Sequence, residues 1–257
     1  MGLIVILEHD LVYIGFKEGF KSRGCFICNI VYDYTIHYLD TLLYENVNSI
    51  TTRKKIYDSL GFCNRHAWLL KAIETSRYRD TMGESIIYAG LAEKIIHDIE
   101  KVQVKEKSII ANFKKKEKLR GKHFARKLSP INSCYVCTNE EENAKRYLDY
   151  FSINFNEPEI MDFYLNSDGL CYRHFLNLLP LLGDEEALKM LDIYKDRLSG
   201  IVPNLHEYLR KMDYRYSSEP KGKEQFACTE AINLISGNDS SYGRLKNDDK
   251  DCNSGTK

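Results

Sequence analysis

Four short cysteine and histidine motifs constrain this chain more strongly than any other feature of its sequence. Each half contains a CxxC motif followed by a CxxH motif, and three thiolates with one imidazole form a complete ligand set for a tetrahedral zinc ion. We therefore expect two Cys3His zinc sites, one in each half of the chain. The first half supplies Cys25, Cys28, Cys63 and His66, and the second half supplies Cys134, Cys137, Cys171 and His174.

Two other chemistries also use closely spaced cysteines. A thioredoxin-like redox pair requires a βαβ pattern around its CxxC, and neither motif here has one. An iron–sulfur cluster with cysteine and histidine ligands stays open as an alternative to zinc. Zinc is favoured because the four ligands of each set leave no coordination position unfilled.

The two halves also match outside the motifs. The Tyr-Leu-Asp run at residues 38–40 reappears at 147–149, with the shift of 109 positions that also separates Cys25 from Cys134. A unit of this length, present only twice, is a duplication rather than a solenoid repeat. We interpret the chain as two pseudo-equivalent helical units, each stapled by its own Cys3His zinc site.

Apolar residues recur at spacings of three and four along most of the chain, which predicts an all-α fold. Gly61 is expected to cap one helix in the left-handed conformation, and Pro203 is expected to kink or divide another. A helix should also begin at Cys63 and carry His66 in its first turn. The other expected helices cover residues 10–21, 28–45, 51–60, 80–101, 184–212 and 224–235.

The sequence divides into six parts on this interpretation, and the last of them is small, polar and expected to be disordered. The parts are an N-terminal helix (1–24), a first helical zinc unit (25–105), a basic linker (106–133), a second helical zinc unit (134–216), a C-terminal turn and helix (217–237) and a tail (238–257).

Charge and the N-terminus indicate the compartment. The 37 basic and 37 acidic residues balance, so no overall field favours nucleic acid or an anionic membrane. The apolar run at residues 3–7 has no basic residue before it and is too short to span a bilayer. We expect a cytoplasmic protein with no membrane partner and reduced thiols. Cys228 should be a buried apolar cysteine, and Cys252 a tail thiol.

The basic stretch at residues 101–127 is the one local sign of a macromolecular partner. Clustered lysines and arginines can neutralise phosphates, so nucleic-acid binding is an alternative function. A solvated helix end and linker is the favoured interpretation, since charge runs usually have that role. The candidate nucleic-acid residues are Lys114, Lys115, Lys116, Lys118, Arg120 and Lys122.

The sequence favours a non-enzymatic role. It has no phosphate loop, nucleophile elbow or HExxH motif, and a catalytic zinc keeps an open position. The leading hypothesis is a zinc-stabilised interaction scaffold for an unknown protein or small-molecule partner. A redox sensor or enzyme with a labile zinc–thiolate site is a further alternative. Arg65 and Arg173, inside the CxxH loops, are expected to orient the sites rather than bind a ligand.

The doubled CxxC and Gly-[Leu/Phe]-Cys-x-Arg-His pattern carries a family resemblance. With the Asp-Tyr-Arg-Tyr run at 213–216, Glu219-Pro220 and the segment 231–237, it resembles an uncharacterised prokaryotic family of helical proteins with duplicated zinc sites. The similarity covers about residues 24–237. It implies a cytoplasmic, all-helical protein with two metal sites and no established activity. The chain departs from the family pattern at Cys228, where a tryptophan is common.

Overall fold

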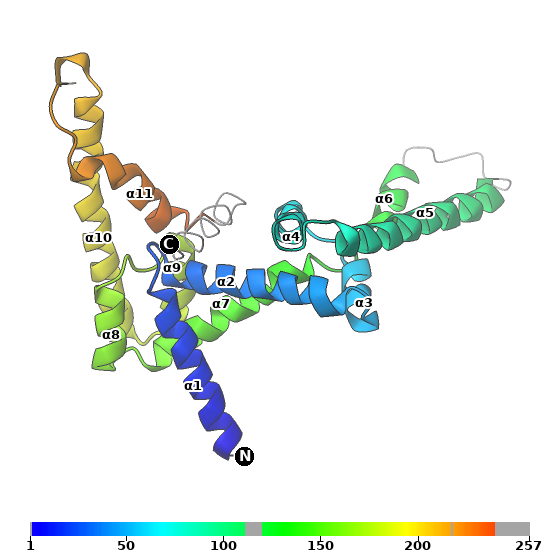
Figure 1. The fold of residues 1–257 in the computed structure, drawn as a ribbon, viewed down its shortest axis with the longest axis horizontal. Coiled ribbons are helices and arrows are strands. Elements are labelled where there is room, and N and C mark those ends of the chain that lie inside the picture. The colour runs from blue at the N-terminus through cyan, green and yellow to red at the C-terminus, as the bar shows by residue number, and fades with distance from the viewer. Residues whose placement is uncertain (1, 111–119, 217, 240–257) are drawn as a thin grey trace. The chain divides into compact units, whose positions relative to one another are not determined.

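The computed structural model describes residues 2–110, 120–216 and 218–239, and within them the chain forms helices and no β-strand (Figure 1). The predicted all-α fold is confirmed. None of the described helices combines the length and the apolar character that crossing a bilayer requires. The α-helices are α1 (Gly2–Gly19), α2 (Phe26–Thr41), α3 (Ile50–Asp58), α4 (Asn64–Arg77), α5 (Met82–Ile110), α6 (Arg120–Leu128), α7 (Tyr135–Ile153), α8 (Pro158–Leu165), α9 (Tyr172–Leu178), α10 (Asp184–Lys211) and α11 (Ala227–Ile235).

Two helices differ from their predicted form. The first begins at Gly2 rather than near residue 10. Helix α10 runs unbroken from Asp184 to Lys211 with Pro203 inside it, so the expected division does not occur. Acidic residues in its first turn and basic residues in its last turn suit the helix dipole and favour a single long helix. The described part of the predicted tail ends at residue 239, and the rest lies outside the described residues.

The chain forms two compact units whose limits differ from the sequence-based division. Unit 1 contains the described residues up to Tyr34 and from Glu141 to residue 239, and unit 2 contains the described residues from Thr35 to Glu140. The boundary therefore falls inside α2 and inside α7. Each unit combines segments from both halves of the sequence.

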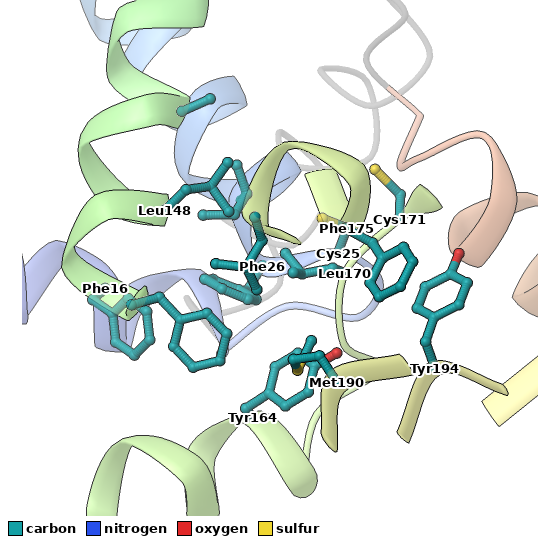
Figure 2. Packing of buried hydrophobic residues seen from close by; sticks show 14 of the residues in the cluster. Phe16, Cys25, Phe26, Leu148, Tyr164, Leu170, Cys171, Phe175, Met190 and Tyr194 are labelled. Carbon is teal, nitrogen blue, oxygen red and sulfur yellow. The ribbon is translucent and has the colours of Figure 1, made fainter. Parts of the chain in front are cut away.

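The core of unit 1 is rich in aromatic rings, as Figure 2 shows. Phe16 of α1 lies edge-on to Phe26 of α2, with ring centroids 5.2 Å apart. Phe151 of α7 and Tyr164 of α8 are fully buried beside them. Cys25 and Cys171 belong to the same buried cluster, so two candidate metal ligands are part of the core.

Unit 2 has an aliphatic core built from four helices. Helix α3 of this unit is followed by a capping turn. The amide of Gly61 donates to the carbonyl of Ile56 at 2.8 Å, and Gly61 has a φ of +100°. The predicted left-handed cap at Gly61 is thus confirmed, and it delivers the chain to the start of α4. The main buried residues are Leu39 of α2, Ile56 of α3, Leu69, Leu70 and Ile73 of α4, and Ile87 and Leu91 of α5.

Candidate metal centres

Unit 1 contains the first of two four-residue clusters that can hold a metal ion. This first centre consists of Cys25, Cys28, Cys171 and His174, whose ligand atoms all lie within 4.8 Å of one another. The Nδ1 atom of His174 is 3.3–3.5 Å from the three sulfurs. Cys28 and Cys171 place their sulfurs 3.8 Å apart.

Unit 2 contains the second centre, made of Cys63, His66, Cys134 and Cys137. The Nδ1 atom of His66 again faces all three sulfurs, at 3.3–3.5 Å. The sulfurs of Cys63 and Cys137 are 3.6 Å apart. The two centres therefore share one geometry and one donor set.

These distances fit tetrahedral zinc. Zinc–sulfur and zinc–nitrogen bonds of about 2.3 Å and about 2.0 Å give tetrahedral edges of about 3.8 Å between two sulfurs and about 3.6 Å between sulfur and nitrogen. The observed separations of 3.6–3.8 Å and 3.3–3.5 Å match both edge lengths to within about 0.3 Å. The residues present therefore fit a closed Cys3His site.

The pairing of the motifs differs from the sequence-based expectation. Each half was expected to complete its own site, and that expectation is wrong: the CxxC at Cys25 meets the CxxH at Cys171, and the CxxC at Cys134 meets the CxxH at Cys63. Equal spacing in both halves makes either pairing chemically equivalent. Only the fold, in which segments of both halves share each compact unit, selects the crossed one.

Helix starts position most of the ligands. Cys63 and Cys171 are the N-cap residues of α4 and α9, so each histidine follows in the first helical turn, as predicted. Gly61 and Gly169, each two residues before these cysteines, have φ values of +100° and +88°. Free amides at a helix start favour a thiolate over a thiol. The same turn therefore aims the ligand and stabilises its charged form.

The end of the described chain covers the first centre, which the sequence did not predict. The side-chain oxygen of Asn238 accepts a hydrogen bond from the amide of Cys25 at 2.7 Å, and its nitrogen donates to the carbonyl of Cys25 at 3.0 Å. Gly237 has a φ of +97°, and a Cβ there would lie 3.2 Å from the sulfur of Cys28. A glycine at this position lets the backbone approach the sulfurs.

A carboxylate accompanies the second centre. The Oε1 atom of Glu140 lies 3.0 Å from Nε2 of His66, and Arg65 forms an ion pair with Glu140. Arg65 thus lies beside the second centre, and its orienting role stays a prediction. Arg173, in the other CxxH loop, is largely exposed and lies 3.6 Å from Glu141.

Without a metal ion, the two clusters favour charged histidine rings beside cysteine thiolates. Burial lowers the pKa of His66, but hydrogen bonds to Cys134 and Glu140 outweigh it and raise the pKa to about 9. Burial likewise lowers the pKa of His174, and Cys171 and Cys28 raise it to about 9. Burial raises the pKa of Cys134, but the facing His66 brings it down to about 6. A metal ion would replace the imidazolium protons as the counter-charge to the thiolates.

Among the described residues, the remaining candidates do not belong to either cluster. Of the predicted nucleic-acid residues, Arg120 and Lys122 lie in α6, and the others lie outside the described residues. Cys228 is exposed on α11, so the expectation of a buried cysteine is wrong. Cys252 lies outside the described residues. Glu140 and Asn238 were missed because no spacing rule marks an outer contact of a metal ligand.

The chain was compared with known proteins, solved structures and protein families. The chain is 24% identical over 200 residues to an "Uncharacterized 23.9 kDa protein in xynA 3'region" of Caldicellulosiruptor sp. (strain Rt8B.4), covering 77% of this chain and 87% of that relative. No solved structure matches the chain. Residues 7–241 match a family of unknown function, DUF6062, and this range includes both metal centres. Because the match spans most of the sequence, the chain belongs to the DUF6062 family.

Proposed function

We propose that this protein is a non-enzymatic interaction scaffold stabilised by two structural zinc ions. The ligands are Cys25, Cys28, Cys171 and His174 at the first centre and Cys63, His66, Cys134 and Cys137 at the second. One observation carries the proposal: in each centre the three nitrogen–sulfur separations and one sulfur–sulfur separation match the edges of a zinc tetrahedron, and all four atoms lie within 4.8 Å of one another. No ligand position is left for a substrate or an activated water.

Free thiols and exposed apolar side chains support the rest of the proposal. All six ligand cysteines are free of disulfides, which suits a reducing compartment such as the cytoplasm. Helix α10 of unit 1 exposes Leu188 and Leu209, at 63% and 65% of their surface. Helix α5 of unit 2 exposes Ile96, at 56%. The proposed partner, a protein or a small molecule, would contact apolar side chains of this kind.

Metal analysis combined with unfolding tests the structural role of zinc. Protein purified without oxygen should contain two zinc ions per chain, and a strong chelator should remove them with loss of cooperative unfolding that added zinc restores. Cys28→Ser and Cys137→Ser should each reduce the content to about one zinc ion. Cys228→Ser, at an exposed cysteine outside both centres, is the matched control and should keep both.

Two results would reject the proposal. Protein that contains iron or no metal would exclude zinc as the resident ion. A chelated protein that keeps its full cooperative transition would exclude a structural role for the metal.

A further inference from the structure

The two metal-binding histidines have different surroundings on the side that faces away from the sulfurs. Both rings present Nδ1 to the sulfurs, so a metal ion bound at Nδ1 would leave the proton of each ring on Nε2. In the second centre Nε2 of His66 lies 3.0 Å from Oε1 of Glu140. The His66 side chain is fully buried, and its Nε2 makes no aligned hydrogen bond within the described residues, where Oε1 of Glu140 is the acceptor that lies within reach. Glu140 is therefore the group that a small rotation of either side chain would bring into hydrogen bonding with this buried nitrogen.

Two further residues hold the Glu140 carboxylate in place. The hydroxyl of Thr35 donates to Oε1 at 2.9 Å, and the guanidinium of Arg65 pairs with Oε2. The Glu140 side chain is only 11% exposed, so these contacts are sheltered from water. The positive charge of Arg65 offsets the carboxylate beside a cluster that already carries thiolates.

The first centre lacks this arrangement. Glu140 stands three residues after the second cysteine of its CxxC, and the residue three positions after Cys28 is Val31. Within the described residues, no carboxylate is paired with His174, and the nearby Arg173 and Glu141 are each about 70% exposed. The two centres thus share their ligands but not their outer contacts.

We propose that Glu140 is a positioning residue for the metal ligand His66, and that it makes the second centre hold its zinc more tightly than it would without this carboxylate. The inference rests on the proposed binding of zinc at both centres. A carboxylate that accepts the second N–H of a ligating histidine fixes the tautomer and the orientation of the ring, and raises the basicity of the ligand. Removing such a partner costs about tenfold to a hundredfold in metal affinity.

Zinc transfer to a coloured chelator tests the proposal. Glu140→Gln keeps the shape of the side chain but removes its charge. We expect this variant to bind one of its two zinc ions about tenfold to a hundredfold more weakly than the wild type does. Its affinity for the other zinc ion should be unchanged. Glu141→Gln, at the adjacent exposed carboxylate, is the matched control and should behave as the wild type. Thr35→Val, which removes only the hydroxyl that holds Glu140, should weaken the same zinc by a smaller factor.

A spectroscopic readout separates positioning from a loss of stability. In a proton–nitrogen correlation spectrum of the wild-type zinc protein, the Nε2 proton of His66 should exchange slowly with water and resonate at lower field than that of His174. Glu140→Gln should shift the His66 signal and leave the His174 signal in place. This measurement on the wild type also decides the question if the variant does not fold.

The possible failures are distinguishable. Equal zinc affinity in the wild type and Glu140→Gln, or equal exchange of the two imidazole protons, would overturn the role of Glu140 while two bound zinc ions left the proposed function intact. A wild-type chain without zinc would instead overturn the proposed function itself.

Discussion

At the scale of single residues, Gly237 brings its backbone close to the sulfurs of the first centre. Its left-handed conformation disfavours a side chain, and a Cβ there would make a tight contact of 3.2 Å with the sulfur of Cys28. The Asn238 side chain next to it is hydrogen-bonded to both backbone polar groups of Cys25. The end of α11 is thereby attached to the site that closes the core of unit 1.

Gly237→Ala should destabilise the zinc-loaded protein by about 1–3 kcal/mol, because the new methyl group is forced against a ligand sulfur. Gly200→Ala is the matched control, since a Cβ at this position in α10 meets nothing within 4 Å. It should stabilise the protein by about 0.5–1 kcal/mol through helix propensity. Denaturant unfolding of both variants measures the difference. Equal stability of the two variants would show that Gly237 does not pack against the centre.

Zinc affinity should fall as the solution becomes more acidic. The pKa of His66 and of His174 is raised to about 9 in the metal-free chain, so both rings are in the charged imidazolium form at neutral pH. Each imidazolium must lose one proton to bind zinc, and so must the thiols of Cys25 and Cys137, whose pKa burial raises, so affinity should rise with pH up to and beyond about 9. Chelator competition between about pH 6 and about pH 8 measures this slope. An affinity that did not change over this range would contradict protonated imidazoles in the metal-free state.

At the scale of elements, Glu74 connects two helices of unit 2. Its buried carboxylate on α4 accepts hydrogen bonds from the amides of Gly83 and Glu84, at 2.6 Å and 2.9 Å. These amides belong to the first turn of α5, where free N–H groups and the helix dipole favour an anion. Glu74 therefore acts as a cap supplied by the neighbouring helix.

Glu74→Gln should lower the free energy of unfolding by about 1–2 kcal/mol, because a neutral amide is a weaker acceptor for two buried N–H groups. Glu93→Gln, on an exposed position of α5, should change it by less than about 0.5 kcal/mol. Thermal and denaturant unfolding provide the comparison. A Glu74→Gln protein as stable as the Glu93→Gln control would exclude the capping role.

Elements were easier to predict than their contacts. Periodic apolar residues and the Gly61 cap indicated helices such as α3, because local sequence determines these features. The cysteine and histidine positions at the starts of α4 and α9 followed from spacing alone. The division considered at Pro203 does not occur, since a helix of this length tolerates one lost hydrogen bond. Glu74, Glu140 and Asn238 act across long sequence separations, which no local pattern reveals.

At the scale of the whole molecule, the crossed pairing of motifs determines how the chain is held together. Each centre joins a CxxC from one half of the sequence to a CxxH from the other, so each zinc ion would close a long loop of chain. Closing long loops restricts the unfolded chain strongly, as other cross-links do. The eight residues of the two clusters could be named from the sequence, whereas their grouping depends on compact units that each combine segments of both halves.

The crossed pairing is tested most directly by replacing zinc with an NMR-active cadmium isotope and recording which side chains couple to each metal. One cadmium signal should correlate with Cys25, Cys28, Cys171 and His174, and the other with Cys63, His66, Cys134 and Cys137. A cadmium signal that correlates with both Cys25 and Cys63 would contradict this account of the molecule.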